Sequence, residues 1–279
     1  MALLCRPARE TEIENFAYGP FTLHVFVIAR YHEVLRRLGL DTLAGVKSFK
    51  GELIKNHKGR RDIQRITIPD EGRPLVLFLK RNWQPYKKDG LHSLLTRGTV
   101  WSQSRVEYEN SLALQRAGLT VAEPVAFGEE CGLLWEKFSF IVTASARGEM
   151  TLEEFLRTNR DRTERRRVLT ALAREIRRMH DAGLASPDLF TRHLFLERGP
   201  TPKFCLIDMA RMDRGTPLSP TRRARDLAAL HVTAPLRFVT TYERLRFLKT
   251  YGDAAILLPL IRLRAMHLLR RRKFADFAQ

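Results

Sequence analysis

The chain has 279 residues, of which 44% are hydrophobic and 29% are charged, and this composition is typical of a folded protein with a sizeable core. Lys and Arg number 49 against 31 Asp and Glu, and the resulting charge of +18 favours anionic partners such as nucleotide phosphates, nucleic acid, lipid headgroups, anionic glycolipid or an acidic protein. The three cysteines are too few and too scattered for a disulfide framework or a zinc cluster. The N-terminal stretch is charged, which argues against a signal peptide, and the apolar run at 21–29 is too short for a transmembrane helix. These features indicate a cytoplasmic protein.

The first half of the sequence is rich in strand patterns and contains one clear helix. Strands are expected at 62–68 and 75–80, on either side of a turn in which Gly72 can take a positive φ. The second strand is apolar on both faces and ends in Lys80, which predicts a buried strand that places a charge at its end. A helix follows over 100–119, with Gly118 as its stop, and then a buried strand over 138–144.

The composition changes after residue 146, where helical patterns take over. A short helix is expected from Thr151, and a long one over 163–182 that Gly183 ends. The apolar positions of the long helix form one stripe: Leu169, Leu172, Ile176 and Met179. After a short strand over 204–208, the segment 221–274 is helical and rich in arginine. The sequence therefore predicts an α+β fold of two lobes, a strand-rich N-terminal lobe over 1–146 and a helical C-terminal lobe over 147–279.

Four charged residues stand at the ends or starts of these elements. Lys80 closes a buried strand, Glu107 lies in the following helix, Asp188 lies in the loop after the long helix, and Asp208 ends the last strand. A charge at the end of a buried strand is usually delivered to a cleft, because an unpaired buried charge is costly. The order Lys, Glu, Asp, Asp matches protein kinases, in which the lysine holds nucleotide phosphates, the glutamate pairs with it, one aspartate accepts the hydroxyl proton and the other binds Mg²⁺.

Each of the four residues also has an ordinary structural interpretation. Lys80 could be a solvated strand end, and Asp188 and Asp208 could be turn or cap residues. Glu107 follows Ser104 by three positions, which fits a capping box. The joint arrangement of four such residues in kinase order is more specific than any one of them and favours the catalytic interpretation.

Several sequence blocks resemble the lipopolysaccharide kinase family, which contains bacterial kinases of core heptose and Kdo. They occur in family order between about residues 49 and 230: LFLKRN, SRVEYENSLALQRAGLTVAEPVAFGE, FSFIVTASARGEMTLEEFL, MHDAGLASPDLFTRHLFL, LIDMARM and RARDLAAL. The resemblance implies a protein-kinase-like fold that uses ATP and Mg²⁺.

The resemblance also implies roles for individual residues. Lys80 and Glu107 would be the phosphate-binding pair, Asp188 the catalytic base and Asp208 a Mg²⁺ ligand. His193 stands where protein kinases place a metal-binding asparagine, so it would contact metal or phosphate, although a packing role is equally compatible. Asp226 would brace the catalytic loop, and Gly59 lies in a loop that would cover the phosphates.

The sequence departs from ordinary protein kinases at two motifs. Ser186 and Pro187 replace the His and Arg that precede the catalytic aspartate, and Met209-Ala210 replaces the Phe-Gly that follows the metal aspartate. The second change argues against an activation-loop flip but is still compatible with metal binding. No Walker loop, dinucleotide fingerprint or serine elbow is present in the sequence.

Arginines gather in three clusters, and the last, over 262–273, is interleaved with apolar residues as in a basic amphipathic helix. Its apolar stripe could be core with a solvated basic face, or it could dock on an anionic membrane at the cytosolic face.

We expect a kinase acting on a hydroxyl of an inner-core sugar, heptose or Kdo, with the lipopolysaccharide core glycolipid as substrate, an acidic protein as a further partner and no specific nucleic acid. The alternatives are an atypical protein kinase and a non-catalytic basic adaptor.

Overall fold

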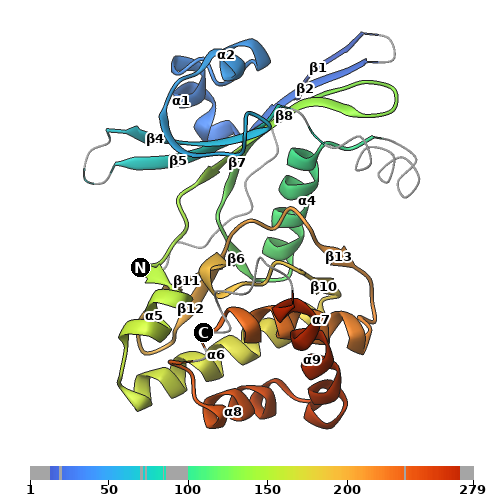
Figure 1. Ribbon diagram of the computed structural model, residues 1–279. Coiled ribbons are helices and arrows are strands. Elements are labelled where there is room, and N and C mark those ends of the chain that lie inside the picture. Colours follow the sequence, from blue (N-terminus) through green and yellow to red (C-terminus); the bar gives the residue numbers. More distant parts are fainter. Residues whose placement is uncertain are drawn as a thin grey trace. The chain divides into compact units, whose positions relative to one another are not determined.

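The computed structural model describes residues 13–18, 21–69, 72, 74–83, 85, 100–235 and 237–270 (Figure 1). The chain divides into two compact units, each considered by itself. Unit 1 comprises Met1–Glu109 and Glu123–Ser145, and unit 2 comprises Asn110–Ala122 and Ala146–Gln279.

Unit 1 is built on an antiparallel sheet. Among the described residues it has seven strands in the order β1-β2-β7-β8-β5-β4-β3. The strands are β1 (Ile13–Tyr18), β2 (Phe21–Val27), β3 (Glu52–Asn56), β4 (Arg61–Ile68), β5 (Leu75–Asn82), β7 (Pro124–Cys131) and β8 (Glu136–Ala144). The central strands β7, β8 and β5 contribute Val125, Val142 and Leu77, among others, to the hydrophobic core of this unit.

The expected hairpin is present, with β4 paired to β5 and Gly72 at φ +100°. The prediction that the second strand ends at Lys80 was wrong, because β5 continues to Asn82. The two extra residues are polar but satisfied: Arg81 Nε donates to Asp62 Oδ1 at 3.0 Å, and Asn82 Nδ2 donates to the hydroxyls of two buried serines at 3.1 Å. Since these side chains are hydrogen-bonded, the strand can remain buried beyond the lysine.

Unit 1 has more helix than the sequence patterns indicate. The expected helix is α4 (Gln103–Arg116), which Gly118 follows at φ +74°. In addition, η1 (Ala29–Tyr31), α1 (His32–Arg37) and α2 (Leu43–Ser48) precede β3 and cover the sheet (Figure 1). Leu35 and Val46 of these helices are fully buried in the same core as Leu77 and Val142. Helices α1 and α2 span six residues each, which is too short for a helical period to be recognised in the sequence.

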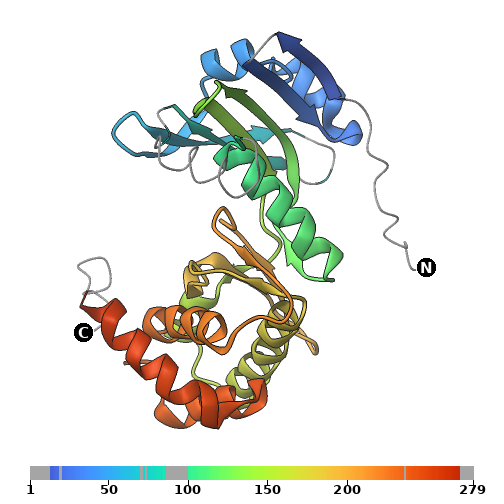
Figure 2. The same cartoon turned by 90° about the vertical axis from the view of Figure 1, so that its right-hand side faces the viewer.

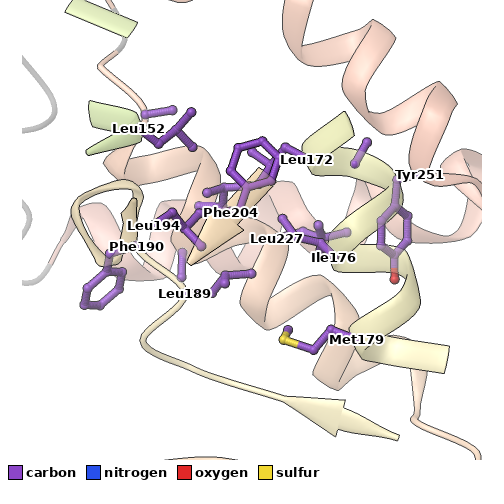
Figure 3. Close-up of a cluster of buried hydrophobic side chains, with 14 of the residues drawn as sticks. Leu152, Leu172, Ile176, Met179, Leu189, Phe190, Leu194, Phe204, Leu227 and Tyr251 are labelled. Carbon is purple, nitrogen blue, oxygen red and sulfur yellow. The ribbon is translucent and has the colours of Figure 1, made fainter. Parts of the chain in front are cut away.

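Unit 2 is mainly helical. Its helices are α5 (Leu152–Thr158), α6 (Arg162–Asp181), η2 (Thr191–His193), α7 (Pro220–Thr233), α8 (Thr241–Tyr251) and α9 (Ala254–Leu269). The predicted stripe on α6 is confirmed as core, and Figure 3 shows Leu172, Ile176 and Met179 in one buried cluster with Leu227 of α7. Gly183 follows α6 at φ +76°, as expected of a helix stop. In Figure 2, α9 (red) lies on the outside of this group of helices.

The described residues of unit 2 also form two small sheets. They consist of β6 (Thr120–Val121), β12 (Lys203–Leu206), β11 (Leu194–Glu197) and β9 (Met150–Thr151) in one sheet, and of β10 (Leu184–Ala185) with β13 (Asp213–Arg214) in the other. The strand expected over 204–208 ends at Leu206, which corrects the placement of Asp208 at a strand end. Ile207 N–H donates to the His193 carbonyl at 3.0 Å, and Asp208 takes φ +58°, so the chain turns away from the sheet there. None of the helices in the described part of the chain is long and apolar enough to cross a membrane.

Candidate active site

Lys80 and Glu107 form a closely held ion pair within unit 1. Lys80 Nζ on β5 lies 2.8 Å from Oε1 and 3.0 Å from Oε2 of Glu107 on α4. The side chains are 14% and 7% exposed, so the pair is shielded from water and its geometry is fixed more firmly than that of a surface pair. The structure therefore brings together two of the four candidate residues and presents an ammonium group that is held in place.

The capping-box alternative for Glu107 was wrong. The hydroxyl of Ser102 caps α4 by accepting the Arg105 N–H at 3.0 Å, and Ser104 lies inside the first turn of the helix. The Ser104 hydroxyl is buried and accepts a hydrogen bond from Asn82 Nδ2 at 3.1 Å. Glu107 is thus two residues beyond the position that a capping box with Ser102 would use, and its carboxylate contacts Lys80 instead.

Two buried carboxylates fix the start of α4, and sequence reasoning missed both. Glu129 of β7 accepts the Ser102 N–H at 3.1 Å, and Glu136 of β8 accepts the Gln103 N–H at 3.0 Å. These N–H groups are at the positive end of the helix, where carboxylates are favoured. Burial raises the pKa of Glu136 to about 7, and the charge of Glu129 adds to this shift. The two strands therefore set the position of the helix that carries Glu107.

Gly59 occupies the turn between β3 and β4. It has φ +72°, and its N–H donates to Asn56 Oδ1 at 2.9 Å. A side chain there would have space but would strain the backbone, since L-residues rarely adopt this conformation. The turn is exposed, as a loop that covers phosphates must be, and its role stays a prediction.

Asp188 lies in the loop after β10, in unit 2. Its carboxylate is 12% exposed and accepts hydrogen bonds from two guanidinium nitrogens of Arg211, with Nε 2.6 Å from Oδ2 and Nη2 in contact with Oδ1. Its carbonyl accepts the Phe190 N–H at 2.7 Å. The loop is therefore tightly turned, and the aspartate is fixed by both backbone and side-chain contacts.

His193 connects Asp188 to Asp208 in unit 2. His193 Nδ1 lies 2.9 Å from the Asp188 carbonyl, and because a carbonyl can only accept, Nδ1 carries the proton. Burial lowers the pKa of His193, which favours the neutral ring, and Nε2 accepts a hydrogen bond from Arg192 Nε at 3.3 Å. Nε2 lies 4.0 Å from Asp208 Oδ2, and Asp208 is 41% exposed. Three of the predicted site residues thus lie together in unit 2.

Asp208, beside His193, fits a Mg²⁺ site in which bound phosphates supply further ligands to the metal. Among the described residues, no cluster of three or more His, Cys, Asp or Glu side chains could hold a metal. Mg²⁺ commonly binds one or two carboxylates and takes its other ligands from substrate phosphates and water. Asp208, exposed and close to a neutral imidazole, offers such a carboxylate.

Asp226 braces the Asp188 loop, as predicted. It is fully buried on α7, and its Oδ2 accepts the backbone N–H of Ser186, two residues before Asp188. Its Oδ1 accepts Arg225 Nε at 2.9 Å, and His180 Nε2 lies 3.3 Å from Oδ2. His180 Nδ1 lies in turn 2.7 Å from the Tyr251 hydroxyl. Asp226 therefore links the loop to three helices of unit 2.

Sequence reasoning missed Asn110 and Arg211. Asn110 Nδ2 donates to the Met209 carbonyl at 2.8 Å, and its Oδ1 accepts Arg214 Nη2 at 2.9 Å, so it holds the loop that follows Asp208. Its spacing of three from Glu107, which places both residues on one face of α4, was an available signal. Arg211 lay within the LIDMARM block but was assigned no role.

A cavity of about 370 Å³ lies elsewhere in unit 2, among the helices. It contains none of the candidate site residues and has largely apolar walls, including Leu172, Leu227 and Leu258. Apolar walls do not suit a triphosphate, so this cavity is not the nucleotide site.

The sequence matches the family model described as lipopolysaccharide kinase (Kdo/WaaP) family over residues 44–251. The lipopolysaccharide core heptose(I) kinase WaaP of Pseudomonas aeruginosa is 28% identical over 230 residues, which cover 78% of this chain and 84% of that protein. The enzyme of the same name from Escherichia coli K12 is 26% identical over 223 residues, covering 76% and 82%.

A solved structure described as WaaP in complex with acyl carrier protein aligns with a TM-score of 0.63 and 24% identity, over 88% of this chain and 98% of that one. At this identity the likeness shows the fold, and it confirms the predicted α+β, protein-kinase-like class.

Proposed function

Because the chain belongs to the lipopolysaccharide kinase (Kdo/WaaP) family, we propose that it transfers the γ-phosphoryl group of ATP to a hydroxyl of an inner-core heptose. Membership makes the chain a phosphotransferase that acts on a sugar hydroxyl. The choice of heptose over Kdo is supported by the names of its relatives. The observation that carries the site assignment is the placement of Asp188, His193 and Asp208 together in unit 2.

In this proposal Asp188 is the catalytic base. It accepts the proton of the acceptor hydroxyl while the hydroxyl oxygen attacks the γ-phosphorus. Phosphoryl transfer needs mainly positioning and positive charge rather than covalent work by the protein. The loop around Asp188 is suited to positioning, since Asp226 and His193 hold its backbone at two places.

The other predicted site residues would bind the nucleotide. Lys80, fixed by Glu107, would neutralise phosphate oxygens, and the turn at Gly59 would cover them. Asp208 would hold Mg²⁺, which supplies positive charge to the phosphates when bound. An imidazole is a poor direct ligand for Mg²⁺. Since His193 Nε2 accepts a hydrogen bond from Arg192 Nε at 3.3 Å and Nδ1 donates to the Asp188 carbonyl, we assign His193 to orient the Asp188 loop beside Asp208.

The test is labelling of defined acceptors with γ-labelled ATP. Dephosphorylated core glycolipid with inner-core heptose should be labelled, and a truncated acceptor that carries Kdo alone should not. Asp188→Asn should lower the rate by at least about 10²-fold, as expected of a lost general base. Asp181→Asn is the matched control, because Asp181 also pairs with arginines in unit 2 but is 48% exposed.

Other outcomes would correct the proposal. Labelling of the Kdo acceptor alone would change the sugar, and labelling of a Ser, Thr or Tyr peptide without sugar would indicate a protein kinase. No thermal stabilisation by millimolar Mg-ATP would favour a non-catalytic adaptor. Equal labelling by wild type and Asp188→Asn would remove Asp188 from the mechanism.

We also propose that α9 docks the enzyme on an anionic membrane. Leu257, Ile261 and Ala265 of this helix are buried in the core, whereas Ile256, Leu263 and Met266 are 60%, 65% and 54% exposed. The helix therefore has a second apolar face, in addition to the core stripe that the sequence suggested. Arg262 and Arg270 are exposed beside it, and residues 271–273 of the predicted basic segment lie outside the described residues. Exposed apolar side chains flanked by cations are typical of interfacial helices.

Vesicle flotation tests this surface. Leu263→Glu combined with Met266→Glu should abolish binding to phosphatidylglycerol vesicles and leave activity on a detergent-solubilised acceptor intact. Leu133→Glu changes an equally exposed leucine of unit 1, at 71%, and should have no effect. Unchanged flotation of the double variant would exclude α9 as the docking surface.

An acidic carrier protein is proposed as a further partner. The charge of +18 suits such a partner, and the structurally similar WaaP is described in complex with acyl carrier protein. Titration calorimetry with acyl carrier protein should show binding that weakens as salt is raised. Absence of binding at low salt would exclude this partner.

A further inference from the structure

Arg211 forms an ion pair with the carboxylate of Asp188, the proposed base. Its Nε lies 2.6 Å from Asp188 Oδ2, and Nη2 contacts Oδ1. The two partners differ sharply in exposure, since the Arg211 side chain is 66% exposed and that of Asp188 is 12% exposed. The guanidinium group therefore covers the outer side of Asp188, where an acceptor hydroxyl would have to approach.

The backbone of Arg211 is anchored although its side chain is exposed. The Arg211 carbonyl accepts the Ser186 hydroxyl at 3.3 Å, and the Met209 carbonyl nearby is held by Asn110 at 2.8 Å. Rotation of the side chain can thus move the guanidinium without moving the loop. Water can solvate the released guanidinium, because the arginine side chain is largely exposed, whereas the shielded Asp188 carboxylate needs a new donor, which the acceptor hydroxyl supplies.

We propose that Arg211 exchanges one anion for another during the reaction: it pairs with Asp188 before the substrates bind, and it binds the transferring phosphoryl group afterwards. This inference rests on the proposed function, because it takes Asp188 as the base and ATP as the donor. The position supports it, since Arg211 follows the proposed metal ligand Asp208 by three residues and already reaches Asp188. The arginine is thus close in sequence to the proposed metal ligand and in direct contact with the group that receives the proton.

The release of Arg211 from Asp188 would precede the transfer of the hydroxyl proton. When Arg211 leaves Asp188, a carboxylate oxygen accepts the proton of the sugar hydroxyl. The bond from the sugar oxygen to the γ-phosphorus forms, and the bond from that phosphorus to the β–γ bridging oxygen breaks, with the electron pair leaving on ADP. The guanidinium group stabilises the equatorial oxygens of the transferring group by charge-assisted hydrogen bonds. After Asp188 releases its proton to water, the arginine can pair with it again.

Arg211→Gln tests the proposal, with Arg198→Gln as the matched control. Arg198 makes a comparable two-point pair with Glu164 in unit 2, with side chains 43% and 12% exposed. We expect Arg211→Gln to lower kcat by about 10²-fold or more, as for loss of one transition-state donor. Arg211→Lys should recover part of the rate, because it keeps the charge but not the planar pair of donors. Arg198→Gln should keep the wild-type kcat.

A ligand that mimics the transferring phosphoryl group gives a second measurement that folding alone would not change. Arg211→Gln should bind Mg-ADP as the wild type does, within about threefold, but should bind Mg-ADP with aluminium fluoride more weakly by a factor similar to its loss in kcat. An unchanged kcat with unchanged affinity for the aluminium fluoride complex would overturn the proposal and leave a structural ion pair. A variant that loses affinity for both ligands would also overturn it, because the arginine would then be a ground-state binding residue.

The experiment separates this proposal from the proposed function. If the wild type transfers phosphate and Asp188→Asn does not, while Arg211→Gln is fully active, only the role of Arg211 fails. If the wild type transfers no phosphate to any acceptor, the proposed function fails with it.

Discussion

Asp226→Asn should destabilise the protein strongly although the two side chains have nearly the same shape. The carboxylate is fully buried and serves three partners: the Ser186 N–H, Arg225 Nε and, at 3.3 Å, His180 Nε2. Asn leaves one oxygen and introduces an N–H₂ group that must face a donor. Removing one member of a buried charged network costs about 3–5 kcal/mol in the free energy of unfolding.

Thermal unfolding with kinetic assays would measure this effect. For a domain of about 150–250 residues, 1 kcal/mol shifts Tm by about 2–4 °C, so a loss of at least about 6 °C is expected. Because Ser186 lies two residues before Asp188, the rate of phosphoryl transfer should fall as well, even below the lowered Tm.

Asp213→Asn is the control, since Asp213 pairs with the same Arg225 but is 36% exposed. It should cost no more than about 1 kcal/mol. If the two variants had equal Tm values, the account of Asp226 as the buried anchor of the loop would be refuted.

Three further substitutions test other parts of the structure. Burial raises the pKa of Glu136 from 4.5 to about 7, so the folded state holds this proton more tightly than the unfolded chain and stability falls as pH rises between these values. Glu136→Gln should therefore have a higher free energy of unfolding than wild type at pH 8, by about 1–3 kcal/mol, but not at pH 4.5, and urea unfolding at both pH values measures this. If the wild type were equally stable at both pH values, the expectation would be contradicted. Glu107→Gln removes the carboxylate that positions Lys80 and should lower kcat/KM for Mg-ATP by about tenfold or more, whereas unchanged kinetics would dissociate the pair from nucleotide binding. Gly128→Ala would place a Cβ 2.2 Å from the Phe140 ring and should cost about 1–3 kcal/mol, whereas Gly132→Ala, with its nearest neighbour at 3.5 Å, should be tolerated in the same unfolding assay.

The longest and most regular elements were predictable from the sequence because their signals are periodic. The apolar stripe of α6, its glycine stop and the β4–β5 hairpin all follow from spacing and turn chemistry, and they are confirmed. Helices α1 and α2 were missed because six residues give less than two helical turns. The ends of β5 and β12 were misplaced because tertiary hydrogen bonds, not local preference, decide where these strands stop.

The sequence indicated which residues to consider for the candidate site, but it indicated few of the contacts between them. The order of charged residues and the family blocks identified Lys80 with Glu107, and the structure pairs them. Arg211 was not recognised, because its contact with Asp188 depends on two loops that approach each other across 23 residues. Similarly, nothing local in Glu129 or Glu136 indicates that these strand residues hold the start of α4.

A crystal structure of the protein with Mg²⁺ and a non-hydrolysable ATP analogue would show whether Lys80 and Asp208 bind the same nucleotide. We expect one nucleotide that has a phosphate oxygen within hydrogen-bonding distance of Lys80 Nζ and carries a Mg²⁺ bound to Asp208, with Asp188 facing the γ-phosphate. A nucleotide that binds without contacting both Lys80 and Asp208 would contradict this expectation.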